Sequence, residues 1–317
     1  MKKLTRSEAA KFLKTHDNFC ILSHRKPDGD TVGSSAALCR GLRQLGKRAY
    51  VLDNEEVTPR FRWLHEGLTK PEAEEGDTIV SVDVASPGML PQAFVPLKDR
   101  ISLRLDHHGT STSFTEYETV DPDSASCAEL VWDVLEELGV SMDEKIGEAV
   151  YVGASTDTGC FRFSNTNAHT FATAAKCAQA GTNIFELNQT LFDTNSLGRL
   201  QMQAWIVEHM QFLRSGKIAV CAIPRSVEEA IGVTEDDMDN MSSFPRTVAG
   251  VCMAATLREN QDGSVRLSVR SIPGYDAALV SQRFGGGGHV CAAGATLRLS
   301  LEEAARAVAD VMLEQPV

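Results

Sequence analysis

The sequence predicts an α/β protein with two domains, the first of which contains a mainly parallel sheet flanked by helices. In the first half, short apolar runs of strand length alternate with segments of helical periodicity, a pattern typical of a parallel sheet. The second half contains a hairpin pattern with Asp262 and Gly263 at its turn, followed by a closing helix, which is typical of a smaller α+β domain. The length of 317 residues also favours two domains over one.

Hydrophobic patterning predicts the elements of the first half. Apolar runs predict its strands, at residues 18–23, 49–52, 77–85 and 101–105. Apolar residues at helical spacing predict its helices, at residues 31–45, 126–138, 144–153 and 168–180. Asp123 and Ser124 are the candidate N-caps of the second of these helices, and Gly139 follows its last turn.

The pattern changes in the second half, which opens with a helix-compatible stretch at residues 195–214. Strands are expected at residues 217–223, 247–257 and 265–271, and a final helix at residues 301–313. We therefore place the first domain at residues 1–190, a helical linker at residues 191–215 and the second domain at residues 216–317.

The charge of the chain limits its partners. With 43 acidic and 31 basic side chains, the formal net charge is −12. Proteins that bind long duplex nucleic acid usually present basic surfaces that replace the counterions of the phosphates. We therefore expect no long duplex among the partners, whereas small phosphorylated ligands remain open.

The cysteines and the apolar runs predict a cytoplasmic protein. The eight cysteines form no C-x-x-C pair and several lie in apolar runs, which indicates reduced, buried thiols. No apolar run approaches the ~18 residues of a membrane span. No apolar stretch follows the charged residues at the N-terminus, so we expect neither membrane insertion nor a secretory signal.

Acidic and histidine side chains gather at four places in the first half, after predicted strands or an apolar segment. They are, in chain order, His24, Asp28 and Asp30, then Asp83, then the triplet Asp106-His107-His108, and finally Asp157. In open α/β sheets, ligands bind at the carboxyl ends of the strands, so these side chains are expected to converge there.

Taken together, these clusters predict a site for divalent cations. Each residue alone has an ordinary explanation, such as an N-cap for Asp30 or a turn for Asp157. Close carboxylates, however, repel each other unless a cation lies between them. Carboxylates mixed with imidazoles suit Mn²⁺, Mg²⁺ or Fe²⁺, and six ligands with one shared are enough for two ions about 3.5–4 Å apart. His107 and His108 point to opposite sides, so one is expected to reach a metal and the other a substrate oxygen.

A glycine run at residues 285–288, followed by His289, predicts an anion site in the second domain. Consecutive glycines let backbone N–H groups approach an anion closely, and the histidine adds a side-chain donor. The run is neither a dinucleotide fingerprint, because Val290 occupies the third glycine position, nor a P-loop. Arg270, near a strand end, could pair with a phosphate through two hydrogen bonds; a surface salt bridge is the alternative of equal weight.

These motifs resemble those of a known family. The pattern H-x-x-x-D-x-D from His24 to Asp30, with the three later clusters, resembles the four motifs of the DHH phosphoesterase superfamily. The tail F-G-G-G-G-H-V-C-A-A-G resembles the DHH-associated substrate domain, DHHA1. In its two-domain length the chain is most similar to the bacterial nanoRNase and 3′-phosphoadenosine-5′-phosphate (pAp) phosphatase subfamily.

The resemblance implies a role for each candidate residue. One metal ion, most simply Mn²⁺ with Mg²⁺ or Fe²⁺ as alternatives, would be held by His24, Asp28 and Asp83. The ligands of a second ion would be Asp30, Asp83, His107 and Asp157, with Asp83 bridging the two. His108 and Asp83 would be the catalytic residues, His108 contacting the scissile phosphate. The residues that anchor the 5′-phosphate of the substrate would be Arg270, Gly286, Gly287, Gly288 and His289.

The resemblance also implies an activity. The enzyme would hydrolyse 5′-phosphorylated oligoribonucleotides, from dinucleotides to pentamers, into mononucleotides, and pAp into AMP and phosphate. The first alternative is a cyclic-di-AMP or linear pApA phosphodiesterase of the same superfamily, and the second is a non-catalytic nucleotide-binding module. A homodimer remains open.

Overall fold

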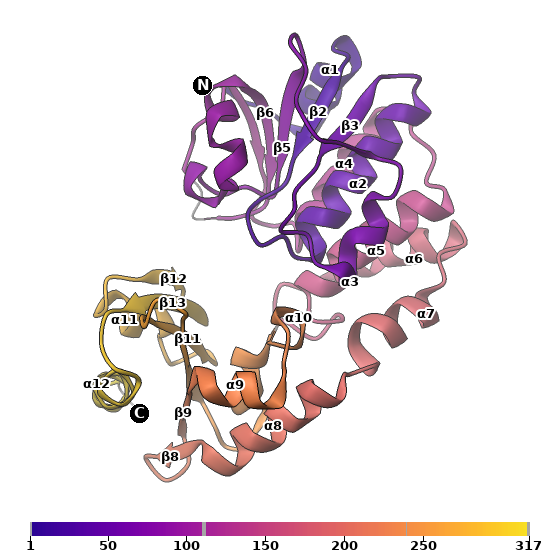
Figure 1. Cartoon of the computed structure of the whole chain (residues 1–317). Helices are drawn as coiled ribbons and strands as arrows, with labels where there is room; N and C mark the ends of the chain where they lie inside the picture. The colour runs from indigo at the N-terminus through magenta and orange to yellow at the C-terminus, as the bar shows by residue number, and fades with distance from the viewer. Residues whose placement is uncertain (1, 110–111, 239, 316–317) are drawn as a thin grey trace. The chain divides into compact units, whose positions relative to one another are not determined.

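The computed structural model of the chain describes residues 2–109, 112–238 and 240–315. The chain divides into two compact units, Met1–Thr194 and Asn195–Val317. Figure 1 follows the chain from the first unit, which starts in indigo, to the second unit, which ends in yellow. Each unit has its own sheet and its own hydrophobic core.

The sheet of the first unit has seven strands among the described residues, each parallel to its neighbours. Their order is β1 (Lys2–Lys3), β7 (Tyr117–Val120), β6 (Ile101–Asp106), β5 (Thr78–Val82), β2 (Phe19–Leu22), β3 (Ala49–Leu52) and β4 (Thr69–Lys70). From β2 the chain proceeds outward to β3 and β4, and then adds β5, β6 and β7 on the other side of β2. The winding therefore reverses between β2 and β5, and ligands of open α/β sheets bind at the carboxyl ends of the strands at such a point.

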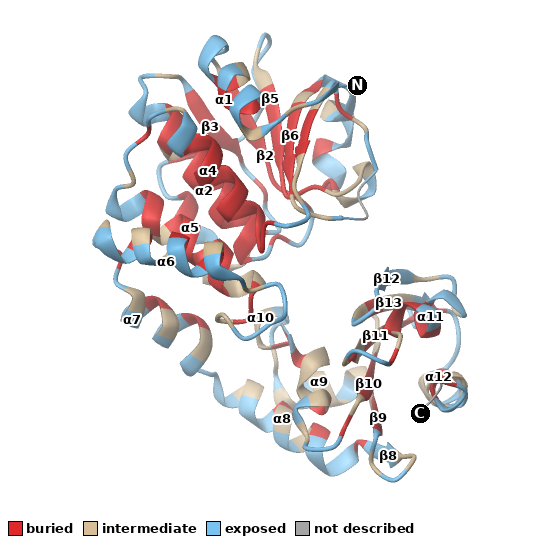
Figure 2. Ribbon diagram, turned by 180° about the vertical axis from the view of Figure 1, so that it is seen from behind, coloured by how far each residue is buried: buried red, intermediate tan, exposed pale blue. Residues whose placement is uncertain are grey.

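Three longer helices pack on one face of this sheet: α1 (Arg6–Thr15), α2 (Gly29–Gln44) and α4 (Cys127–Glu137). A fourth, α5 (Glu144–Asp157), packs against α2 and α4. Figure 2 shows α2 and α4 buried along much of their length, whereas α6 (Ala168–Gln179) has an exposed side. The shorter helical segments are α3 (Pro59–Arg62), η1 (Trp63–His65), α7 (Ile184–Asn188) and η4 (Gln189–Asp193).

The other face of the sheet is covered by 3₁₀-helical segments, η2 (Pro87–Met89) and η3 (Gln92–Arg100). Phe94 of η3 is buried against Cys20 and Leu22 of β2. Strands that are covered on both faces read as continuous apolar runs rather than as alternating patterns, which explains why the sequence predicted β2, β3, β5 and β6. The short β1, β4 and β7 were not predicted. In β7, the buried Glu118 interrupts any apolar run.

The second unit contains a mixed sheet. Its order is β12 (Gly287–His289), β13 (Ala292–Leu297), β11 (Val265–Ser271), β10 (Met253–Glu259), β9 (Ile218–Ile223) and β8 (Gln211–Leu213). Only β9 and β10 are parallel among these pairs, and β10 and β11 form the predicted hairpin. The mixed sheet of this unit and the parallel sheet of the first unit together confirm the predicted fold class.

The helices of the second unit form two groups. In the first group, α11 (Ala277–Gln282) and α12 (Leu301–Leu313) share a core with β10 and β11. In the second, a methionine-rich core with β9 joins α8 (Leu197–His209), α9 (Arg225–Ile231), α10 (Glu235–Met238) and η5 (Met241–Thr247). The strand predicted at residues 247–257 is wrong at its start. Thr247 is the last residue of η5, and Gly250 has a φ of 88°, which is incompatible with an extended strand, so β10 begins only at Met253.

Membrane-spanning helices are absent from the described part of the chain, where every helix is too short or too polar to cross a bilayer.

Candidate metal centre

The candidate site lies where β2, β5 and β6 end. The register pairs Leu22 with Ser81, and Val82 with Leu105, so the three strands end at nearly the same level. His24, Asp83 and His107 follow those ends, and the backbone N–H of Asp83 donates to the carbonyl of Leu105 at 2.9 Å. The structure thus brings three of the four predicted clusters to neighbouring strand ends, on either side of the reversal in winding.

The first turn of α2 carries two more of the predicted ligands. Asp28 is the N-cap of α2 and accepts hydrogen bonds from the N–H groups of Asp30 and Thr31, at 3.0 and 3.1 Å. Asp30 is 1% exposed and accepts hydrogen bonds from the N–H groups of Cys127 and Ala128, at 2.7 and 2.9 Å. These two N–H groups open α4, where unpaired donors and the helix dipole favour a carboxylate. The carboxylate of Asp30 is therefore fixed by a second helix.

The N-cap of α4 differs from the prediction. Ser126, rather than Asp123 or Ser124, accepts a hydrogen bond from the N–H of Glu129 at 3.2 Å. The Ser-x-x-Glu spacing in the sequence is the signal that could have identified it. This cap fixes the start of α4, and hence the N–H groups that hold Asp30.

Asp157 is the last residue of α5, which continues one turn past its predicted end at residue 153. It reaches the other ligands because α5 packs very closely on both α2 and α4. A Cβ on Gly33 would lie 2.3 Å from the carbonyl oxygen of Ala149, and a Cβ on Gly153 would lie 2.4 Å from the Cβ of Ala128. Any side chain at either glycine would separate the helices and move Asp157 away from Asp30.

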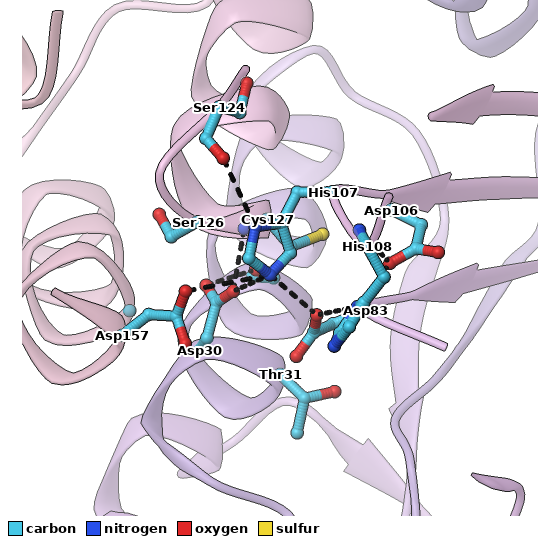
Figure 3. A network of polar contacts seen from close by, with 12 residues as sticks. Asp30, Thr31, Asp83, Asp106, His107, His108, Ser124, Ser126, Cys127 and Asp157 are labelled. Atoms are coloured by element: carbon cyan, nitrogen blue, oxygen red, sulfur yellow. Dashed lines mark hydrogen bonds and ion pairs between the residues drawn. The ribbon is translucent and has the colours of Figure 1, made fainter. Parts of the chain in front are cut away.

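The side chains form two groups that share Asp83, and Figure 3 shows the second of them, around His107. In the first group, His24 Nε2 lies 3.6 Å from Asp28 Oδ1 and 3.4 Å from Asp83 Oδ2. In the second group, the distances from His107 Nε2 are 3.7 Å to Asp30 Oδ2, 3.6 Å to Asp83 Oδ1 and 3.7 Å to Asp157 Oδ2.

These separations are those of ligands around shared cations. They are too long for hydrogen bonds. Two atoms that each bind one ion at about 2.1 Å lie about 3.0–3.5 Å apart, however, close to the spacings observed. The two oxygens of Asp83 face different groups, so this carboxylate has the position of a bridge.

Hydrogen bonds orient two of the histidines alike. Nδ1 of His24 lies 2.7 Å from the carbonyl oxygen of Arg25, and Nδ1 of His107 lies 3.2 Å from that of Ser124. A carbonyl only accepts, so each Nδ1 carries the proton. Nε2 is therefore the ring nitrogen that faces the carboxylates in both residues, as in a metal-binding histidine.

His108 is oriented differently. Its Nδ1 donates to Asp106 Oδ1 at 2.8 Å, and Asp106 is fully buried. Burial opposes the charged ring, but the hydrogen bond to Asp106 and the charge of Asp83 outweigh it and raise the pKa of His108 to about 9. His108 is therefore cationic in the metal-free protein and offers N–H donors rather than a lone pair.

Electrostatics favour a cation among the carboxylates. Burial and the neighbouring carboxylates, Asp83 among them, raise the pKa of Asp30 and of Asp157 well above the ordinary range. Asp83 Oδ1 is buried and has no hydrogen-bond donor among the described residues. Asp83 also has a φ of 60°, which costs free energy in a non-glycine residue and is typical of functional sites. A carboxylate and imidazole donor set of this kind fits Mn²⁺, Mg²⁺ or Fe²⁺.

Arg104 was not predicted as a site residue, although its side chain is among the largest fully buried ones. It lies within β6, and its guanidinium donates to Glu118 Oε2 at 2.7 Å and to Asp106 Oδ2 at 3.2 Å. It therefore holds the carboxylate that orients His108. An arginine inside the apolar run of residues 101–105 was the signal available in the sequence, because a charge in a buried strand requires a partner.

In the second unit, Arg270 and His289 lie on one face of the sheet. Ala292 of β13 is directly opposite Arg270 of β11 and directly opposite His289 of β12, and paired residues point to the same face. Arg266, four residues before Arg270 on the same strand, shares this face. Burial and the charge of Arg266 lower the pKa of Arg270. Close cations of this kind favour a bound anion.

The glycine run forms an edge strand rather than an irregular loop. Gly286 precedes β12, and Gly287 and Gly288 are its first residues. Gly288 has a φ of 143°, and a Cβ there would lie 2.6 Å from the carbonyl oxygen of Ala292. Only glycine fits this position beside His289.

Two comparisons with known domains cover most of the chain. Residues 18–154 match the model of the DHH family, N-terminal domain, and residues 215–315 match the model of the DHHA1 domain. Together with the fold, these matches define a phosphoesterase, and its acidic and histidine groups could bind metal ions. The chain belongs to the DHH family.

Two relatives and one solved structure are similar to this chain over most of its length. The chain is 34% identical to a "Bifunctional oligoribonuclease and PAP phosphatase NrnA" from Thermus thermophilus, over 93% of this chain and 89% of the relative. It is 24% identical to a protein of the same name from Bacillus subtilis, over 96% and 97% of the two chains. A crystal structure of an exopolyphosphatase-related protein from Bacteroides fragilis has the same fold, with a TM-score of 0.88, 20% identity and coverage of 98% and 95%.

Proposed function

We propose that this chain is a manganese-dependent phosphoesterase that degrades short 5′-phosphorylated oligoribonucleotides to mononucleotides and converts pAp into AMP and phosphate. The observation that carries the proposal is the position of Asp83, whose two oxygens face two separate groups of ligands. A shared carboxylate of this kind supports a centre of two metal ions rather than one.

His24, Asp28 and Asp83 would hold one ion. The other ion would be held by His107 and by three carboxylates, those of Asp30, Asp83 and Asp157. Each of these carboxylates faces His107 Nε2. When bound, such a pair of ions supplies an activated water molecule and neutralises charge that develops on the phosphoryl oxygens.

The remaining polar residues of the site would act on the substrate directly. His108 is held by the hydrogen bond from its Nδ1 to Asp106, so a protonated Nε2 can donate a hydrogen bond to a non-bridging phosphoryl oxygen. The same ring could give a proton to the leaving 3′-oxygen. Asp106, fixed by Arg104, keeps the proton on Nδ1 and leaves Nε2–H as the donor toward the substrate.

The proposed substrates share one bond and one anchor. Release of the 3′-phosphate of pAp and cleavage of a 5′-phosphorylated dinucleotide both break a bond between phosphorus and a 3′-oxygen. Arg270 and His289, with the backbone of Gly286, Gly287 and Gly288, would hold the terminal 5′-phosphate. An anchored terminus favours short chains, in keeping with the net charge of −12. The names of the relatives from Thermus thermophilus and Bacillus subtilis support the same two substrates.

A product assay tests the proposal. The protein is loaded with Mn²⁺, Mg²⁺ or Fe²⁺ in parallel and offered pAp, 5′-phosphorylated dinucleotide RNA, a long RNA strand, cyclic di-AMP and pyrophosphate at equal concentration. Fast turnover of the first two substrates, and fastest turnover with Mn²⁺, is expected. A preference for cyclic di-AMP would replace the substrate assignment by the second-messenger alternative. Metal binding without turnover of any substrate would contradict the enzymatic role.

A further inference from the structure

Arg6 connects α1 to the segment that leads into α4. It is the first residue of α1, and its guanidinium donates to the carboxylates of Asp121 and Asp133 and to Ser124 Oγ, the last at 3.2 Å. Asp121 and Ser124 lie between β7 and α4, whereas Asp133 lies within α4. One side chain therefore ties the start of the chain to both sides of this connection.

The segment that Arg6 holds orients two of the proposed metal ligands, as Figure 3 shows. The carbonyl oxygen of Ser124 accepts from His107 Nδ1 at 3.2 Å, which leaves Nε2 free to face the carboxylates. Two residues later, Ser126 caps α4, whose first N–H groups hold Asp30. A shift of this segment would therefore change the second ligand group. The first group would stay in place, because His24 is held by the carbonyl of Arg25.

The position of Arg6 is not explained by α1 itself. A cation in the first helical turn opposes the helix dipole and costs stability. The contacts of Arg6 across the unit account for it instead, because Asp133 is 8% exposed and its carboxylate also meets His169 Nε2 at 3.1 Å. Glu129, which is fully buried, lies on the same helix one turn earlier. Arg6 is thus a cation that neutralises part of the negative charge of several neighbouring carboxylates.

We propose that Arg6 is a positioning residue for the second ligand group. It fixes the carbonyl of Ser124, which in turn holds His107 in the tautomer whose Nε2 faces Asp30, Asp83 and Asp157. The inference rests on the proposed metal centre only for its effect on metal affinity, because the tautomer of His107 can be read without any metal.

The test compares Arg6→Gln with Lys11→Gln, a matched change on the same helix that also removes one positive charge. Lys11 is exposed. Nitrogen-15 NMR of the imidazoles in the metal-free protein reports the tautomer of each histidine. We expect His107 to carry its proton on Nδ1 in the wild type and in Lys11→Gln, and to lose this preference in Arg6→Gln. His24 should be unchanged in all three proteins, as an internal control.

Calorimetric titration of each protein with Mn²⁺ alone gives the second readout. Loss of the support of an oriented ligand typically weakens metal binding by about 10–100-fold. We expect this loss at one of two sites in Arg6→Gln, at neither site in Lys11→Gln, and partial recovery in Arg6→Lys, which keeps the charge. An unchanged His107 tautomer, or an equal loss at both sites, would overturn the proposal. If the wild type bound no metal, the proposed function would fail, while the tautomer reading would still decide the role of Arg6.

Discussion

Replacing Asp106 by asparagine should lower the pKa of His108 without removing any proposed metal ligand. Burial opposes the charged form of this ring, and the hydrogen bond to Asp106 is the largest of the effects that outweigh burial. The rise of the His108 pKa from 6.5 to about 9 corresponds to about 3 kcal/mol of preferential stabilisation of the charged ring. Removal of an opposite charge at hydrogen-bond distance typically changes a pKa by about 1–3, so a large part of this stabilisation should be lost.

The sign of the effect on stability follows from the raised pKa. The charged ring of His108 contributes stability that is complete below pH 6.5 and is lost as the pH rises through about 9. The stability difference between the wild type and Asp106→Asn should therefore be largest on the acidic side of this window and should shrink on its alkaline side. Any part of the difference that is constant with pH reports the loss of the Arg104 contact with Asp106 instead.

The measurement is an NMR titration of the His108 ring in the metal-free protein, with the resonance assigned from His108→Gln. Glu118→Gln is the matched control, because it removes the other carboxylate of Arg104 and leaves the Asp106–His108 hydrogen bond intact. We expect a lower pKa in Asp106→Asn and an almost unchanged pKa in Glu118→Gln. Equal pKa values in the wild type and Asp106→Asn would refute the assignment of Asp106 as the group that keeps His108 charged.

Three further predictions concern the ligands and the anchor. Asp83→Asn should reduce the number of bound Mn²⁺ ions from two to none and slow turnover of pAp and of the dinucleotide together by about 10²–10³-fold or more; metal analysis and rate assays would contradict the shared bridge if either activity persisted. Metal affinity should rise with pH, because the raised pKa values of Asp30 and Asp157 mean that protons must leave before a cation binds. Calorimetry should find that the affinity of Asp157→Asn depends less steeply on pH. An affinity of the wild type that does not change with pH would contradict this competition between protons and metal. Arg270→Gln should raise KM about 10–100-fold for a 5′-phosphorylated dinucleotide, from the loss of a charged hydrogen bond, but not for the same dinucleotide without its 5′-phosphate; equal effects on both would contradict the anchor.

Local patterns in the sequence predicted the site residues at the strand ends better than the site residue on a helix. Apolar runs that end in Asp83 or precede His107 carry both the strand and the ligand in one local pattern, so β5 and β6 were predicted together with their site residues. Asp157 was expected in a loop and lies in a helix, because its position depends on the close packing of Gly153 against α4. Such packing is a tertiary contact, and helix periodicity alone does not report where a helix stops.

Two buried or partly buried arginines were not predicted as site residues, because their partners are distant in the sequence. Arg104 is paired with Glu118 on a neighbouring strand, and Arg6 meets Asp121 and Asp133 more than a hundred residues later. A single sequence can indicate that an arginine in an apolar strand requires a partner, but it does not indicate which distant residue the partner is. In the second unit, the glycine run was recognised, but only the register of β12 with β13 aligns His289 with Arg270.

The candidate ligands come from distant parts of the first unit, so the stability of this folded unit depends on the supply of metal. The candidate ligands lie between residues 24 and 157, on three strand ends and two helices, so they meet only after the parallel sheet and its covering helices have assembled. A cation that binds this arrangement binds the folded chain and not the unfolded one. It stabilises the fold by RT ln(1 + c/Kd), which grows with the logarithm of the free metal concentration c over the dissociation constant Kd. Cells depleted of the metal would therefore hold a chain that is not only inactive but also opens more often and is degraded faster. Abundance of the protein, and not only its turnover rate, would then follow the supply of its metal.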